Sequence, residues 1–249
     1  MKKTLQSTLC LAMIVTFIVF CFSGCIIVGL TDSRSVTARG NHETYVLNVS
    51  PFNAIKVEGH FLIRHYASHS DTVTLAVQSN VREHIIIEVI NGELIARTTR
   101  RLSFGSNRAP VLTVSTPVLN RVTILGAGDF IMNDKIIADS LDIIIAGASD
   151  GKITLDVNRL SVDISGAGDV ELSGNANTAN FNLLGAGDIK ALELQTVDTT
   201  IRLSGAGTVS VSCSENLQII ASGAGNVRYR GSPRINQSTT GPVSIRQVN

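Results

Sequence analysis

Four aspartates recur at nearly constant intervals in the second half of the chain. Asp129, Asp150, Asp169 and Asp188 each end a copy of the motif Gly-Ala-Gly/Ser-Asp. Carboxylate oxygens are ligands that Ca²⁺ prefers in proteins. If the copies stack on one another, these four side chains form a ladder of carboxylates, which is a candidate cation site.

A structural role explains more of these positions. Two further copies of the motif carry Thr208 and Asn226 instead of aspartate, which removes the charge but keeps a side chain suited to a turn. An aspartate at a bend accepts hydrogen bonds from backbone N–H groups. We therefore favour a turn role, expect no metal and no cofactor, and keep the cation ladder as the alternative.

Three histidines and four arginines in the first half could also bind ligands. His60, His65 and His69 are close in sequence and could form a metal site, but their segment is predicted to be strand and loop, so the i, i+4 geometry of a helix does not apply to His65 and His69. We expect them to be exposed or in loops. Arg97, Arg100, Arg101 and Arg108 flank a glycine-serine loop. They could contact acidic glycans or lipid headgroups, although a solvated loop is the simpler interpretation.

No set of residues indicates catalysis. The acidic residues are scattered, and no pair has a spacing that suggests acid–base chemistry. The Gly-x-Gly motifs are followed by neither a helix nor a Lys-Ser/Thr pair, which excludes a phosphate-binding loop. We predict no catalytic residues.

The element that positions the aspartates is a repeat of about 20 residues. The first glycines of its copies, from Gly126 to Gly241, are separated by 21, 19, 19, 20, 18 and 18 residues. A near-constant period of this length indicates a solenoid, in which each repeat is one coil stacked on its neighbour.

Alternating apolar residues flank each glycine motif. Two and four residues before the first glycine, the side chains are almost all aliphatic, as in Val122 and Ile124 or Ile143 and Ile145. Apolar residues at intervals of two also follow the motif, and no 3.6-residue period occurs in 119–249. We therefore predict an all-β fold, a parallel β-helix of about six glycine-marked coils spaced about 4.8 Å apart. The glycines suit a positive φ or a close backbone approach.

The N-terminus predicts export. Lys2 and Lys3 precede an apolar run from Leu9 to Phe22, which is short for a membrane span and suits a secretory signal. Ser23-Gly24-Cys25 resembles the bacterial lipobox, so we predict a signal peptide over 1–24, a palmitate-bearing lipid on Cys25 and a flexible tether over 25–41. An ordinary cleaved signal or an uncleaved anchor helix are the alternatives.

Charge and cysteine content agree with an exported protein. Without Lys2 and Lys3, 19 basic and 20 acidic side chains remain, a net charge of −1 that gives no reason to expect a nucleic-acid partner. Once Cys10 and Cys21 leave with the signal and Cys25 is lipidated, Cys213 has no disulfide partner. It continues an alternating apolar pattern, so we expect it to be buried.

The region 42–118 lacks the glycine motif but is also β-rich. Strands are predicted at 45–49, 55–63, 72–78, 85–90, 94–98 and 111–115, and Asn91-Gly92 predicts a tight hairpin. This part could be an irregular start that caps the solenoid 119–249, or a small β-domain beside it.

The chain resembles a known family over roughly residues 50–232. The residues that carry the resemblance are Phe52, Ile55 and Val57, then 92–94 and 116–119, leading into serial Gly-Ala-Gly-Asp. Together they look like the bacterial GIN domain, described as an auto-transporter adhesin head. The resemblance implies an exported or lipid-anchored β-solenoid and defines no catalytic or binding residue.

These observations lead to one main hypothesis and two alternatives. We expect a non-enzymatic protein, lipid-anchored in the bacterial cell envelope at the outer membrane or cell surface, that presents a surface for adhesion to a protein or glycan. A polysaccharide-active enzyme on the same scaffold is the first alternative. A periplasm-facing structural or sensory lipoprotein is the second.

Overall fold

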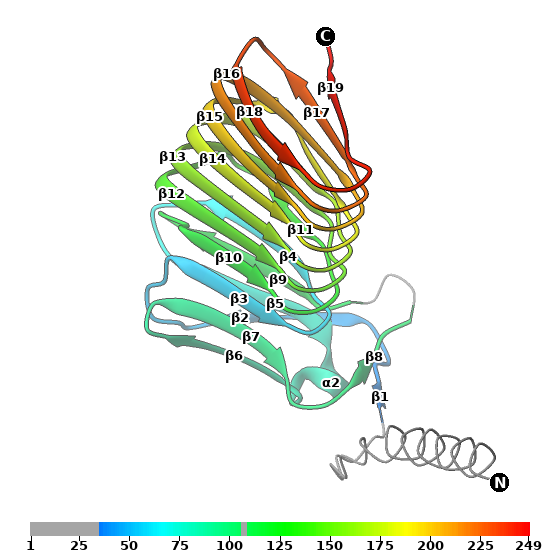
Figure 1. Cartoon of the computed structure of the whole chain (residues 1–249). Helices are drawn as coiled ribbons and strands as arrows, with labels where there is room; N and C mark the ends of the chain where they lie inside the picture. Colours follow the sequence, from blue (N-terminus) through cyan, green and yellow to red (C-terminus); the bar gives the residue numbers. More distant parts are fainter. Residues whose placement is uncertain (1–34, 106–108) are drawn as a thin grey trace, which may run out of the picture. The chain divides into compact units, whose positions relative to one another are not determined.

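The backbone winds into a parallel β-solenoid around a narrow aliphatic core (Figure 1). The computed structural model describes residues 35–105 and 109–249. Of these described residues, 66% are in strands and 2% in helix, and the solenoid has about 7 turns. The prediction of an all-β parallel β-helix is therefore confirmed.

The longest strands each run along one coil, and all but the first of them extend from one glycine corner to the next. They are β12 (Ile136–Ile145), β13 (Gly151–Ile164), β14 (Val170–Leu183), β15 (Asp188–Leu203) and β16 (Thr208–Ala221). The parallel register places Ile145 beside Ile164 and Ile164 beside Leu183. These residues all stand two before the first glycine of their motif, so the sequence repeat and the structural coil coincide.

The core consists of columns of aliphatic side chains that stack from coil to coil. The column four residues before the glycines is fully buried, at 0% exposure, in Val122, Ile143, Val162, Phe181, Ile201 and Ile219. Burial of apolar surface contributes roughly 25 cal/mol per Å² to folding. Because each coil adds only one thin layer, every coil depends on its two neighbours to bury that layer.

The first glycine of each motif is required because backbones of adjacent coils come very close there. A Cβ atom on Gly147 would lie 1.7 Å from the carbonyl oxygen of Gly126, and one on Gly166 would lie 1.8 Å from that of Gly147. Neither glycine has a positive φ, whereas Gly128 does, at 140°. Two reasons were predicted for the glycines, a positive φ and a close backbone approach. Close approach explains the column of first glycines.

The solenoid begins before the first glycine motif. Strand β3 (Ala54–Glu58) pairs in parallel with β10 (Arg121–Ile124), and β4 (Leu62–Ala67) pairs with β11 (Phe130–Met132). Between β3 and β4, His60 bridges to Ala127. The predicted single strand 55–63 is therefore wrong, because the chain turns a corner at Gly59, where φ is 127°.

A further coil lies on the other side of β3 and β4 although it follows them in sequence. Strand β7 (Glu93–Thr98) pairs with β3, and β9 (Val111–Thr116) pairs with β4. The chain therefore adds this coil beneath the first one before it crosses to β10. The region 42–118 therefore does two things: it forms the first coils of the solenoid, and it supplies the strands that cover the end of the solenoid.

Three antiparallel strands cover the end formed by β7 and β9. Strand β5 (Thr72–Gln78) pairs with β9 and with β2 (His42–Leu47), and β6 (Ile85–Ile90) pairs with β7. The β6–β7 hairpin turns at Asn91 and Gly92, whose φ values of 52° and 77° are those of a tight primed turn, as predicted. Covering strands of this kind protect a sheet edge from pairing with other chains.

The remaining elements lie at the two ends of the solenoid. A short helix, α2 (Ser79–Arg82), and the paired strands β1 (Val36–Thr37) and β8 (Leu102–Ser103) adjoin the covered end. The last coil comprises β17 (Asn226–Arg230), β18 (Arg234–Thr239) and β19 (Ser244–Gln247). In 35–105 and 109–249, no helix is long and apolar enough to cross a membrane.

Candidate functional site

The aspartate column bonds adjacent coils to each other. Asp150 Oδ1 accepts the backbone N–H of Asp169 at 2.9 Å, Asp169 Oδ1 accepts that of Asp188 at 3.0 Å, and Asp188 Oδ1 accepts that of Thr208 at 2.8 Å. Asp129 makes a longer contact of this kind, 3.4 Å, with Asp150. The carboxylates thus accept backbone N–H groups, but from the next coil and not from their own turn.

A lysine neutralises part of this column. Lys190 Nζ lies 2.6 Å from Asp169 Oδ2. Its hydrogen bond lowers the pKa of Asp169 below the usual value, and the same bond raises the pKa of Lys190. Among the described residues, no group of three or more His, Cys, Asp or Glu side chains is arranged to hold a metal ion.

The three histidines do not converge. His60 is exposed at the corner next to Ala127, and its ring meets that of Phe104 edge-on with centroids 6.0 Å apart. His69 is exposed in the loop after β4. His65, in contrast, is 2% exposed and points into the core, so the expectation of an exposed or loop histidine is wrong there.

His65 is an unusual core residue. Neither of its ring nitrogens has a hydrogen-bond partner in the described part of the chain. Burial lowers its pKa, and the nearby charge of Asp134 opposes this effect only in part. The inward position is occupied by Met132 in the neighbouring coil and by Val114 on the other side, so the histidine stands in an apolar column. Its neutral form is therefore favoured.

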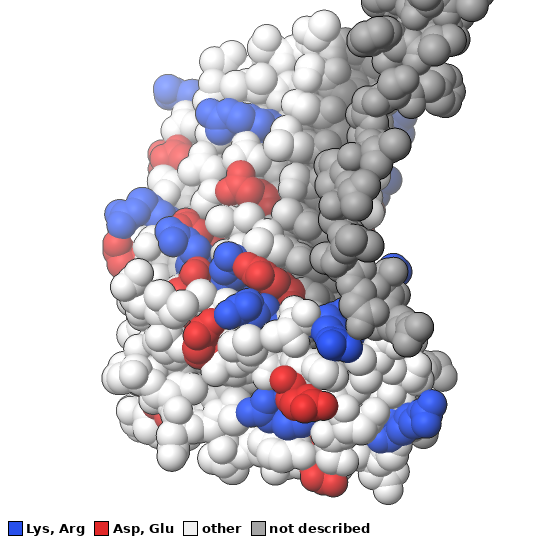
Figure 2. Space-filling view, turned by 90° about the horizontal axis from the view of Figure 1, so that it is seen from below, with Lys and Arg blue, Asp and Glu red and all other residues white. Residues whose placement is uncertain are grey.

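The predicted arginine surface is only partly assembled. Arg97 lies on β7 and pairs with Glu88 at 3.1 Å, while Arg100 and Arg101 are exposed after that strand. Arg108 lies outside the described residues. Figure 2 shows acidic and basic side chains interspersed on this end of the molecule, with no large patch of one sign. Such a surface gives little electrostatic attraction to a polyanion.

Two other predicted positions can be placed. Cys213 is 3% exposed, as expected for a small core residue, and its Sγ lies 3.2 Å from the carbonyl oxygens of Val197 and Asn216. Cys25, together with the whole predicted signal peptide, lies outside the described residues.

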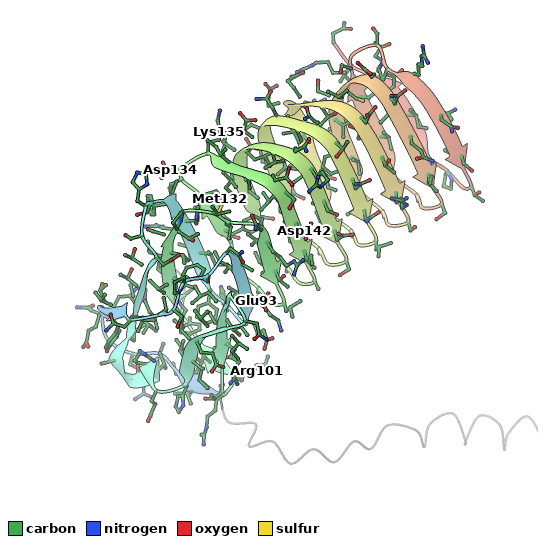
Figure 3. All side chains as sticks on the ribbon, turned by 90° about the vertical axis from the view of Figure 1, so that its left-hand side faces the viewer. Glu93, Arg101, Met132, Asp134, Lys135 and Asp142 are labelled. Atoms are coloured by element: carbon green, nitrogen blue, oxygen red, sulfur yellow. The ribbon has the colours of Figure 1, made fainter. Side chains whose placement is uncertain are left out.

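A shallow groove of about 460 Å³ crosses the outer face of the first coils. Its charged side chains include Lys56, Glu93, Arg121 and Asp142, and Figure 3 shows Glu93 and Asp142 on the same side of the solenoid. Arg121 pairs with Asp142 at 3.0 Å. Because the charges of this groove are partly paired and exposed, it offers weak specificity for a small ligand.

A larger hollow of about 770 Å³ lies at the glycine corner next to the covered end. We call it the corner hollow. Its apolar lining includes Phe61, Leu62, Phe104, Val111, Ala127 and Ala148, and its polar lining includes His42, His60, Arg64 and Asp129. A concave, partly apolar site with a few polar groups is the usual form of a ligand site.

The corner hollow exists because one corner lacks the glycine motif. Gly59, His60 and Phe61 occupy the positions that Gly126, Ala127 and Gly128 occupy one coil later. The larger His60 side chain projects there instead of an alanine, and Phe104 packs against it. In sequence, the corner was hidden inside the predicted strand 55–63, and only the isolated Gly59 marked it.

The polar groups of the corner hollow can both donate and accept hydrogen bonds. Arg64 has no ion pair with any described residue and presents a rigid fork of five donors. Asp129 contributes carboxylate oxygens, of which Oδ1 has only the long contact with Asp150. Phe104 and His60 add flat ring surfaces.

Comparison with known families identifies the chain. The family model "Putative auto-transporter adhesin, head GIN domain" matches residues 51–233. The chain belongs to this family. The predicted resemblance is confirmed, and membership of an adhesin-head family indicates a non-enzymatic protein of the cell envelope or surface. No curated protein matches the chain.

Solved structures confirm the fold of this GIN-domain protein. A "putative adhesin" from Bacteroides fragilis superposes with a TM-score of 0.80 at 24% identity, covering 86% of this chain and 100% of that chain. A "putative lipid binding protein" from Parabacteroides distasonis gives 0.69 at 20% identity, covering 87% and 100%. A "putative adhesin" from the same species gives 0.66 at 19%, covering 86% and 100%.

Proposed function

We propose that this protein is a non-enzymatic, lipid-anchored adhesin of the bacterial cell envelope. Its solenoid is the binding head, and Cys25 carries the lipid that holds it to the membrane. The family match over residues 51–233 is the observation that carries this proposal. The lipobox-like Ser23-Gly24-Cys25 supports the anchor.

The architecture suits a binding head. Each coil is bonded to the next by backbone ladders and by the aspartate column, so the outer surface is held in a fixed geometry. A rigid scaffold that positions a recess loses little conformational entropy when it binds a partner. The corner hollow is the recess we assign to a protein or glycan ligand, with Arg64 and Asp129 as its polar contacts.

Labelling and protease accessibility on intact cells test the anchor and its location. We expect incorporation of labelled palmitate, its loss in Cys25→Ala, and digestion of the solenoid by protease added from outside. Absence of labelling would contradict the lipid anchor. Labelling with full protection would place the solenoid inside the envelope and contradict the adhesin function.

Variants of the corner hollow test its role in binding. Arg64→Ala and Phe104→Ala should each lower adhesion of expressing cells to host-cell or glycan-coated surfaces at least fivefold. Arg202→Ala in β15, another exposed arginine without an ion pair among the described residues, is the matched control and should leave adhesion unchanged. Equal adhesion by all four proteins would exclude the corner hollow as the adhesive site.

A further inference from the structure

The two ends of the solenoid differ in whether further strands pair with the outermost coil. At one end, β5 and β6 pair with the outermost coil, as described above. At the other end, β18 pairs with β16 and β19 pairs with β17, and no described strand pairs with their outer edges. Figure 1 shows β18 and β19 as the last strands of the stack.

The side chains of this last coil are those of an edge and not of a core layer. Leu217, Ile219 and Ala221 are buried, but their register partners Ile235, Gln237 and Thr239 are all exposed. Likewise, the partner of Tyr229 is the exposed Gln247. Two of the three inward positions of β18 thus hold a polar side chain where β16 has an aliphatic one. The core layer formed by β16 is therefore covered on its outer side by side chains that are also stable in contact with water.

Basic charge is concentrated around this edge. Residues 199–249 contain five arginines and a single acidic residue, Glu215. The arginines are Arg202, Arg228, Arg230, Arg234 and Arg246. Arg230 binds the carbonyl oxygen of Leu192 at 3.2 Å and Glu193 at 3.4 Å. Within the described residues, Arg228, Arg234 and Arg246 have no carboxylate partner.

We propose that the exposed edge of β18 and β19 binds an extended acidic segment of a partner protein by adding it to the solenoid as a further strand. Backbone N–H and C=O groups on the edge supply the affinity, as in other cases of strand addition. Arg228, Arg234 and Arg246 supply specificity for carboxylates, since an arginine presents a planar fork of donors that matches a carboxylate.

The charge distribution favours this partner over a second copy of the chain. Two copies joined edge to edge at this end would bring the same arginines together, and like charges across an interface cost affinity. At the opposite end β5 and β6 occupy the edges of the outermost coil, so the outermost strands there are the antiparallel β2 and β6 and not a parallel coil of the solenoid. An acidic segment instead places its carboxylates beside the arginines of the edge strands, Arg234 and Arg246.

Peptide binding to the full-length chain in detergent tests the proposal. The probes are a fluorescent peptide of alternating Glu and Val, a Lys-Val peptide of the same length, and a Glu-Val peptide with methylated backbone nitrogens. We expect the Glu-Val peptide to bind at least tenfold more tightly than either control. Hydrogen exchange should slow in 234–247 when it binds.

A double charge reversal at the edge completes the test. Arg234→Glu with Arg246→Glu should weaken Glu-Val binding at least tenfold and improve Lys-Val binding. Arg39→Glu with Arg101→Glu makes the same change in net charge at the covered end, on two exposed arginines, and should alter the binding of both peptides less than twofold.

Three results would overturn the proposal. Equal binding of the methylated peptide would show attraction by charge without strand addition. Concentration-dependent dimers that protect 234–247 would identify a second copy as the occupant. Failure of the Glu-Val peptide to bind would mean that the arginines only prevent edge pairing. Each of these results is separate from the anchor and adhesion tests, because none depends on Cys25 or the corner hollow.

Discussion

Asp150 Oδ1 accepts the backbone N–H of Asp169 in the next coil at 2.9 Å, so this carboxylate joins two coils rather than closing its own turn. The column of aspartate acceptors ends at the coil of Thr208. There a backbone oxygen takes the place of the carboxylate, because the N–H of Asn226 donates to the carbonyl oxygen of Gly207 at 2.9 Å. This explains why Thr208 can stand in the aspartate position of its coil.

Removal of the Asp150 carboxylate should destabilise the solenoid. In Asp150→Ala, the N–H of Asp169 loses its acceptor, which we expect to lower the free energy of unfolding by about 1 kcal/mol. Asp150→Asn keeps the oxygen and should cost less than half as much. Urea denaturation monitored by circular dichroism measures both.

The same pair of variants distinguishes the cation ladder from the turn role. If Asn is as harmful as Ala, the charge and not the acceptor matters. A rise in Tm on adding calcium to the wild type, absent in Asp150→Asn, would support a bound cation and contradict a purely structural column.

The Asp169–Lys190 pair should affect ionisation more than stability. In Lys190→Met, the hydrogen bond that lowers the pKa of Asp169 is lost, so this pKa should rise toward its usual value. Both side chains are about half exposed, so the free energy of unfolding at pH 7 should change by less than about 1 kcal/mol. Carboxyl NMR titration measures the pKa. An unchanged Asp169 pKa would show that the pair does not persist in solution.

The glycine column should tolerate no side chain. In Gly147→Ala, the new Cβ meets the carbonyl oxygen of Gly126 at 1.7 Å, so two coils must separate. We expect a loss of about 3 kcal/mol or more, at the upper end for overpacking, or failure to fold. Gly105→Ala is the matched control, because its Cβ meets nothing within 4 Å. Similar urea midpoints for both variants would contradict close approach as the reason for the glycines.

Local patterns predicted the repeating part of the fold because each coil repeats the same contacts. The alternation around Ile145 and Ile164 showed which side chains face inward, and the register confirms it. The position of the coil formed by β7 and β9 could not be predicted. This coil comes after β3 and β4 in sequence, but in the stack it lies on the side of β3 and β4 opposite to β10 and β11. Nothing in a local window encodes that order of stacking.

The candidate sites show the same limit. The hydrogen-bonding role of Asp169 was predictable from its motif, but the partner coil was not. The corner hollow depends on His60 and Phe104, which are far apart in sequence and meet only because a corner and a loop converge. The prediction for His65 was wrong because histidine is usually a surface residue, and the sequence pattern of β4 alone does not show that this position faces the core.

The buried His65 should make stability depend on pH. Burial lowers its pKa in the folded state below the unfolded value of about 6.5, so the unfolded chain binds more protons in this window. Its contribution to stability is therefore fully present above pH 6.5 and is lost as the pH falls below that value. The loss is at most about 1.4 kcal/mol for each pH unit down to the folded pKa.

His65→Met should remove this dependence, because methionine already occupies the equivalent position 132 of the neighbouring coil. Urea midpoints at pH 7.5 and pH 5.0 should differ by clearly less in His65→Met than in the wild type. His69→Met, which replaces an exposed loop histidine, is the control and should keep the wild-type difference. If His65→Met also keeps that difference, the acid sensitivity comes from other groups, and His65 is protonated in the folded core without cost.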